Sequence, residues 1–291
     1  MKNKSKFLLG LGAALILPSV SMTRAATMAD VLFIVDESGS MGGEHAWLGT
    51  MVGQLETQLI AAGVTNNQYG LVGYGASGSG GHSVAGHQHT VGGGAYGTAP
   101  QLSTATTGLV VTGATEDGWQ AISYALSNYT FRSGAALNVI LVTDEDRDVT
   151  SGDTYASTLA ALVGKSALLN VVVDAAYRNG QQQTSLGIDS LGNAYTADGF
   201  GGYTTTGGGF ASSGFGTTIA DYVNMALATG GAAWDLNQLR AGGLTSDSFT
   251  KAFTDIKVKE IVEQTPDGGT TLAMLGAVLA GLAGLRRKFG V

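Results

Sequence analysis

The sequence predicts one doubly wound α/β domain with a mostly parallel central sheet. Apolar runs that suit buried strands alternate along the chain with segments whose apolar residues recur at helical spacing. Residues 31–35 are all apolar, which is typical of a parallel strand covered on both faces. Polar, oxygen-bearing residues follow this strand directly, at the edge of the sheet where such folds bind their ligands.

The first strand ends in a turn that carries one carboxylate and two hydroxyls. Asp36, Ser38 and Ser40 occupy alternate positions between the run 31–35 and a helix predicted over 44–62. A set of oxygen donors suits a hard divalent cation such as Mg²⁺. Serine or aspartate before a helix is also a common N-cap, so this pattern alone leaves a purely structural cap open.

The later elements continue the alternation of strands and helices. Strands are predicted over 69–74, 138–144, 167–174 and, at an edge of the sheet, 232–236; helices are predicted over 99–108, 116–129, 154–163, 219–228 and 245–262. Short connections between most of these segments indicate a single domain over residues 26–262.

Two glycine-rich insertions, about 76–94 and 177–217, interrupt this pattern and are predicted to be surface segments, the second an irregular excursion with a short hairpin. The first holds His82, His87 and His89, and a His-x-His pair on one side of a strand could contribute to a Zn²⁺ site. No Cys, Asp or Glu lies within that insertion. We therefore favour a solvated hairpin or loop there.

Composition excludes several classes of function. Among 291 residues there are 46 Gly but 3 Pro and no Cys, so disulfides and thiolate metal sites are excluded. The formal net charge is −7, and much of the positive charge lies at the two ends of the chain. A domain this acidic argues against a nucleic-acid partner, which would require a basic surface.

Residues 1–25 have the pattern of a secretory signal peptide. Lys2, Lys4 and Lys6 precede an apolar run over 7–17, and small residues follow at cleavage-type positions. The apolar run is too short for a resident membrane span. We therefore expect the protein to be exported.

Two further residues complete a recognisable set with the turn after the first strand. Thr115 lies on a loop before a predicted helix, and Asp144 ends a second apolar strand. With Asp36, Ser38 and Ser40, they resemble the metal-ion-dependent adhesion site (MIDAS) of von Willebrand factor A (vWA) domains. The resemblance covers roughly residues 28–262 and implies a Rossmann-like doubly wound vWA fold. It also implies a metal site made of five residues, Asp36, Ser38, Ser40, Thr115 and Asp144, which would hold Mg²⁺, with Mn²⁺ or Ca²⁺ as alternatives.

The resemblance implies binding, and we expect no enzyme activity. In vWA domains, neutral hydroxyls leave the cation with residual positive charge, so it can accept a carboxylate from a partner protein or an acidic polysaccharide. The chain has no His-Glu-x-x-His, Gly-x-Ser-x-Gly or Walker motif. We therefore expect cation-dependent adhesion or matrix attachment. The alternative is a structural component of an extracellular polymer or biofilm matrix, in which the metal serves only stability.

Residues 263–291 resemble the sorting signal of exosortase substrates, the PEP-CTERM group and its VPDSG-type variants. A short Pro-Asp-Gly-Gly motif precedes an apolar run over 272–285 and a basic cluster over 286–288. Thr265 and Gly268 stand where the VPDSG variant has Val and Ser. The resemblance implies an exosortase-type processing enzyme, transient membrane insertion, and a final place at the cell surface or in the extracellular matrix of a Gram-negative-type bacterium. A permanent transmembrane helix is the alternative.

Overall fold

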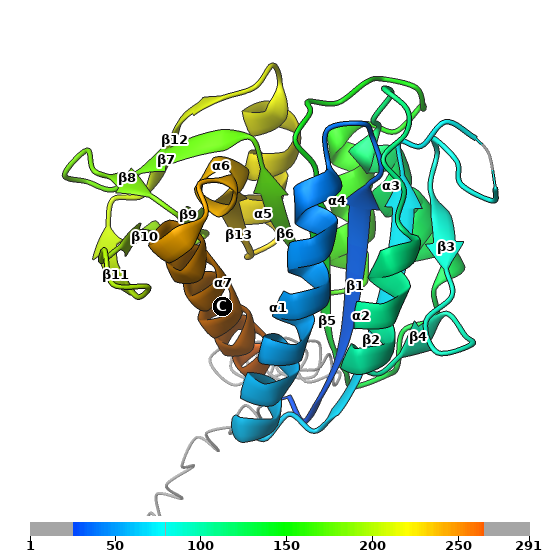
Figure 1. Cartoon of the computed structure of the whole chain (residues 1–291), viewed down its shortest axis with the longest axis horizontal. Helices are drawn as coiled ribbons and strands as arrows, with labels where there is room; N and C mark the ends of the chain where they lie inside the picture. The colour runs from blue at the N-terminus through cyan, green and yellow to red at the C-terminus, as the bar shows by residue number, and fades with distance from the viewer. Residues whose placement is uncertain (1–25, 79, 265–291) are drawn as a thin grey trace, which may run out of the picture.

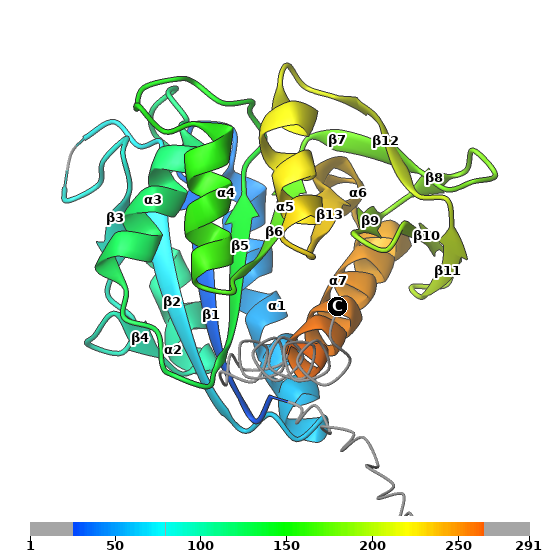
Figure 2. The same ribbon diagram turned by 180° about the vertical axis from the view of Figure 1, so that it is seen from behind.

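A large, mostly parallel sheet forms the centre of the protein, with helices on both of its faces (Figures 1 and 2). The computed structural model describes residues 26–78 and 80–264. The predicted signal peptide and the apolar and basic parts of the sorting signal lie outside the described residues. The mixed α/β class predicted from the sequence is confirmed.

Parallel strands occupy the middle of this sheet, and antiparallel strands extend it on both sides. The order is β11-β10-β9-β13-β6-β5-β1-β2-β3, with β4 also paired to β2. The parallel strands are β1 (Met28–Asp36), β2 (Asn66–Tyr74), β5 (Ala136–Val142), β6 (Leu168–Val173) and β13 (Ala232–Asp235). Since β1 lies between β5 and β2, its carboxyl end has a loop on either side.

The side chains of β1 alternate between two buried cores, as the apolar run predicts. Val31, Phe33 and Val35 pack beneath α1 (Gly42–Ala61), α2 (Ala99–Ala105) and α7 (Gly243–Glu263). Leu32 and Ile34 pack beneath α3 (Gly118–Asn128), α4 (Tyr155–Gly164) and α5 (Asn224–Ala228). Pairing with β2 on one side and β5 on the other sets the register of β1, and therefore the direction in which the residues after it point.

Three short helical segments complete the helical layers. The 3₁₀ turn η1 (Thr106–Gly108) continues α2, and the π-helical turn η2 (Ile219–Val223) leads into α5. The helix α6 (Leu236–Arg240) follows β13 directly, and the side chain of Asp235 caps it by accepting the N–H of Asn237.

The insertion over 177–217 contains the predicted hairpin, over residues 193–207, but the insertion as a whole is a structured extension of the sheet and not the irregular excursion that was predicted. The strands β9 (Gly187–Asp189), β10 (Asn193–Ala197) and β11 (Tyr203–Gly207) extend the main sheet. The strands β7 (Ala175–Arg178), β8 (Thr184–Ser185) and β12 (Phe210–Gly214) form a second small sheet. Because β9 pairs with β13, β13 is not the edge strand that the sequence predicts.

Aromatic packing joins this extension to the core. The ring of Tyr195 stacks on Trp234, with centroids 5.4 Å apart, and both side chains are buried. The ring of Trp234 in turn meets Phe253 of α7 edge-on, with centroids 5.4 Å apart. The first insertion is less regular: it contains β3 (His87–His89), and β4 (Tyr96–Gly97) follows it; both pair antiparallel with β2.

None of the helices in the described part of the chain is both long and apolar enough to cross a membrane. The apolar run 272–285, on which the prediction of a transmembrane helix rests, lies outside the described residues.

The Asp117 carboxylate links the start of α3 to the loop after β5. It accepts hydrogen bonds from Arg147 Nε at 2.6 Å, from Ser151 Oγ at 2.8 Å and from the Gln120 N–H at 3.2 Å. The guanidinium of Arg147 also lies 4.1 Å from the ring centroid of Trp119. Burial raises the pKa of Asp117, but the bonds from Arg147 and Ser151 outweigh it and hold this pKa below its usual value.

We predict that Asp117→Ala lowers the free energy of unfolding by about 3–5 kcal/mol, because the buried Arg147 charge is left unpaired. Urea unfolding measures this loss. The control is Lys251→Ala, which removes an exposed ion pair with Asp255 and is expected to cost no more than about 1 kcal/mol. Equal losses in the two variants would contradict the role of the buried pair.

Candidate metal centre

Four of the five predicted site residues lie at the carboxyl ends of two adjacent parallel strands. Asp36 is the last residue of β1, and Asp144 follows two residues after the end of β5. Parallel pairing sets Val35 opposite Val142, so the loops after both strands leave the same edge of the sheet. The parallel topology therefore brings together carboxylates that are more than a hundred residues apart.

Hydrogen bonds connect four of the five predicted residues. The Ser38 N–H donates to Asp36 Oδ1 at 2.7 Å, and the two hydroxyl oxygens of Ser38 and Ser40 lie 3.2 Å apart. Ser40 Oγ donates to Asp144 Oδ1 at 2.9 Å. The hydroxyl of Thr143, which the sequence analysis did not select, donates to Asp36 Oδ2 at 2.8 Å.

The fifth residue, Thr115, lies on an adjacent loop. A Cβ added to Gly75 would stand 2.9 Å from Asp36 Oδ1 and 3.7 Å from the carbonyl oxygen of Thr115, so both are close to the same glycine. The loop is tied to the first turn because Gly39 N–H donates to Gly113 O at 3.3 Å. Within the described residues, no hydrogen bond joins the Thr115 hydroxyl to the other four. Metal binding by the five residues stays a prediction.

Negative charge is concentrated around Asp36. Burial raises the pKa of Asp36 to about 7, although hydrogen bonds from Ser38 and Thr143 oppose this shift. Burial, together with the nearby charges of Asp36 and Asp148, raises the pKa of Glu116 to about 8. No cationic side chain in the described part of the chain forms an ion pair with Asp36. A buried carboxylate beside neutral hydroxyls is a donor set that fits a hard divalent cation.

Arg240 borders the cluster on the side of α1. Its guanidinium donates to Glu44 Oε1 at 2.5 Å, to Asp144 Oδ2 at 2.8 Å and to the carbonyl of Ser40 at 3.1 Å. Arg240 therefore pairs with Oδ2 of Asp144, whereas Oδ1 of Asp144 accepts from the Ser40 hydroxyl. Sequence analysis missed Arg240 and Glu44, because nothing in the pattern of α6 indicates where that helix ends in space.

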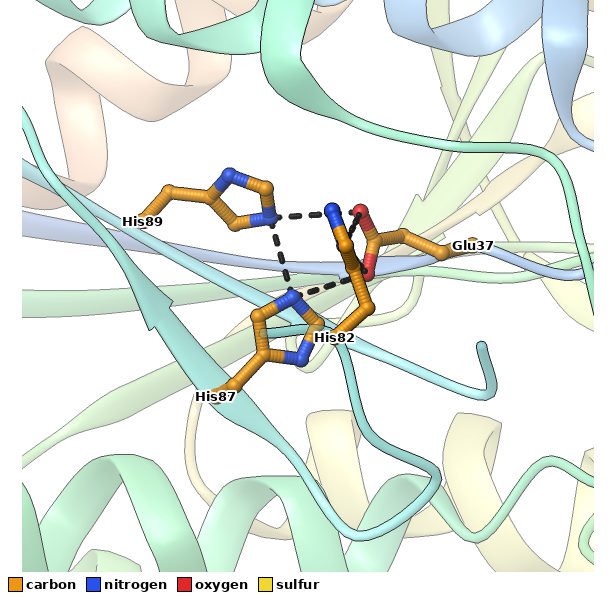
Figure 3. Close-up of side chains that lie close together, drawn as sticks. All are labelled: Glu37, His82, His87 and His89. Carbon is orange, nitrogen blue, oxygen red and sulfur yellow. Dashed lines mark hydrogen bonds and ion pairs between the residues drawn. The ribbon is translucent and has the colours of Figure 1, made fainter. Parts of the chain in front are cut away.

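The first insertion forms a hairpin, as predicted, because β3 pairs antiparallel with β2, but the prediction that its histidines are solvated is wrong. His82, His87 and His89 surround the carboxylate of Glu37, and their side chains are 17, 12 and 10% exposed (Figure 3). The insertion itself contains no Asp or Glu, and Glu37, the residue after Asp36, supplies the carboxylate. The only signals in the sequence were the His-x-His spacing and the unassigned Glu37 beside the predicted site.

We predict a pH-dependent effect of Asp36→Asn when a chelator removes cations. Because the pKa of Asp36 is raised from 3.8 to about 7, its stabilising contribution is full below about pH 4 and is lost as the pH rises to about 7. The amide does not ionise, so the stability of the variant relative to the wild type should rise over this interval by on the order of 4 kcal/mol. Urea unfolding in EDTA at several pH values measures the difference, and a constant difference would contradict the burial of an unpaired charge.

Comparison with known proteins identifies the C-terminal motif. Residues 266–289 match the VPDSG-CTERM motif, which confirms the predicted type of sorting signal. The motif indicates an exported protein sorted to the cell surface and implies processing by an exosortase-like enzyme. Among solved structures, the chain is similar to an aerotolerance-related membrane protein from Bacteroides fragilis NCTC 9343 with multiple mutations to serines. The two are 14% identical, 79% of this chain and 99% of that chain are covered, and the TM-score is 0.42. No curated protein matches the chain.

Proposed function

We propose that the protein is a surface-sorted vWA-type protein that binds an acidic protein or polysaccharide through a divalent cation, in adhesion or matrix attachment. The observation that carries the proposal is the oxygen cluster at the end of β1. Within it, Asp36 is fully buried and has no cationic partner among the described residues, while Ser40 is exposed to solvent. A cation held there would offset the buried charge and still be accessible from outside.

The proposed ligands of the cation are the carboxylates of Asp36 and Asp144 and the hydroxyls of Ser38 and Ser40, with Thr115 from the adjacent loop. When bound, Mg²⁺ supplies a positive centre that can accept an external carboxylate. Hydroxyl ligands add no negative charge, so they leave more of the cation's charge for the partner. The Thr143 hydroxyl and the Ser38 N–H orient the Asp36 carboxylate toward this role.

A groove beside the cluster supports an extended ligand. A cavity of about 790 Å³ is lined by Ser40 and by residues of α1, α6 and α7, including Trp47, Arg240 and Lys251. Arg240 and Lys251 line this groove but are paired with Glu44, Asp144 and Asp255, so the positive charge that an acidic polymer needs would come from the bound cation. The proposed role is binding, since the chain carries none of the common hydrolase or phosphate-binding motifs.

We predict that the purified protein binds immobilised polygalacturonate or polyglutamate in Mg²⁺ and that EDTA abolishes this binding. Ser40→Ala should weaken binding at least about tenfold, because it removes a metal ligand from an exposed position with little effect on the core. Surface plasmon resonance measures both effects.

The matched control is Ser212→Ala, which removes an exposed serine hydroxyl on β12, outside the cluster. It should bind like the wild type. Binding that continues unchanged in EDTA would contradict the proposal and favour the alternative, a structural matrix component in which metal serves only stability.

A further inference from the structure

We propose that Glu37, His82, His87 and His89 form a separate site for a divalent transition metal of the zinc class. This site is distinct from the oxygen cluster and goes beyond the proposed function. One ligand atom from each of the four residues lies within 4.8 Å of the other three. Figure 3 shows the three imidazole rings directed at the carboxylate.

The sheet topology explains why these residues meet. Glu37 directly follows β1, and its N–H donates to the carbonyl of Tyr74 at the end of β2. The strand β3 pairs with β2 so that His87 is opposite Gly73 and His89 is opposite Leu71. Because side chains two apart on a strand point to the same face, both imidazoles of β3 face Glu37. His82 approaches from the loop between β2 and β3.

The distances fit a tetrahedral metal site. The carboxylate oxygens of Glu37 lie 3.1 Å from His82 Nδ1, 3.0 Å from His87 Nε2 and 3.2 Å from His89 Nε2. The two Nε2 atoms of His87 and His89 are 3.2 Å apart. Four ligand atoms at about 2.0–2.1 Å from a tetrahedral Zn²⁺ are roughly 3.3–3.4 Å from one another. These four separations are slightly shorter than that spacing, and no separation in the set exceeds 4.8 Å, so small side-chain movements in both directions would bring the four atoms around one ion.

Hydrogen bonds alone account poorly for this arrangement. A neutral imidazole carries one N–H, yet His87 Nε2 faces both Glu37 and His89 Nε2, which itself faces Glu37. A single cation would satisfy all these lone pairs together. The Ser83 N–H donates to His87 Nδ1 at 3.1 Å, which puts the imidazole proton on Nε2 before metal binds. Metal binding through Nε2 requires the other tautomer, in which that proton is carried on Nδ1 after exchange with solvent, so the Ser83 N–H must give up this acceptor.

The surroundings of Glu37 are built to hold a charged group. Its side chain is fully buried, and the Val110 N–H donates to Oε1 at 3.0 Å, as an outer-shell partner of a metal ligand would. Burial raises the pKa of Glu37, but hydrogen bonds from His87 and His89 outweigh it and hold the pKa well below its usual range. Gly73 leaves the necessary space, because a Cβ there would overlap the carboxylate of Glu37 and the ring of His87.

The donor set determines the class of metal and its role. Three imidazoles and one carboxylate suit Zn²⁺ and related transition metals, whereas the oxygen cluster suits Mg²⁺. Four protein ligands leave no open position in a tetrahedral site, which is typical of structural zinc. The metal would fasten the loop between β2 and β3 to the turn that also carries Asp36. The competing explanation is that no metal binds and that a protonated histidine offsets the negative charge of Glu37. Titration with Zn²⁺ distinguishes this explanation from a metal site.

The test is titration of the chelator-treated full-length protein with Zn²⁺, by calorimetry and by metal analysis after dialysis. We expect one Zn²⁺ per chain that excess Mg²⁺ does not displace, and a melting temperature that rises with Zn²⁺ concentration. Co²⁺ in place of Zn²⁺ should give the strong visible absorption of a four-coordinate ion. The chain has no Cys, so thiolates cannot contribute to the spectrum.

His82→Gln should weaken Zn²⁺ binding at least about tenfold, and its loop position keeps the risk of unfolding low. His45→Gln is the matched control, because the fourth histidine contacts the Asp36 carbonyl, outside this cluster. It should bind Zn²⁺ like the wild type. Absence of saturable Zn²⁺ binding in the folded wild type, or equal binding by His82→Gln, overturns the proposal. Neither result depends on Mg²⁺-dependent ligand binding, so the two proposals fail separately.

Discussion

The structure around the sheet edge depends on the burial of two consecutive carboxylates, Asp36 and Glu37, at the end of the central strand. A buried carboxylate is costly unless hydrogen bonds or positive charge compensate it. The two are compensated differently, because the chain turns between them. Three imidazoles and the Val110 N–H surround Glu37, whereas the partners of the Asp36 carboxylate in the described part of the chain are Ser38 and the Thr143 hydroxyl, none of them cationic.

The loops at this edge are arranged around those two charges. The Thr115 loop lies against the first turn through a backbone bond from Thr112 N–H to Glu37 O at 2.8 Å, and the loop after β5 supplies Thr143 and Asp144. A buried ion pair between Asp117 and Arg147 holds that second loop to the start of α3. Rigid loops are what a preorganised binding site requires, since a ligand then need not order them.

The sequence predicts the parts of this architecture that depend on local pattern and on parallel topology. The run 31–35 indicates β1. Because the carboxyl ends of parallel strands lie at the same edge of a sheet, the sequence also predicts that Asp36 and Asp144 are close together. Apart from one hairpin, the strands over 177–217 were missed because they are short and rich in glycine, so the alternation that marks a strand spans too few residues. The contact of Glu37 with the histidines was missed because it depends on the pairing of β3 with β2. Arg240 reaches Asp144 across 96 residues through the packing of α6, which no local pattern encodes.

The central claim is that neighbouring carboxylates serve two cation sites of different chemistry. Crystals grown with both Mn²⁺ and Zn²⁺, with anomalous scattering recorded at each metal's absorption edge, test it most directly. The account predicts a zinc peak between Glu37 and the three imidazoles and a manganese peak beside Asp36, Ser38 and Ser40. Both metals in one cluster, or no metal between Glu37 and the imidazoles, would contradict it.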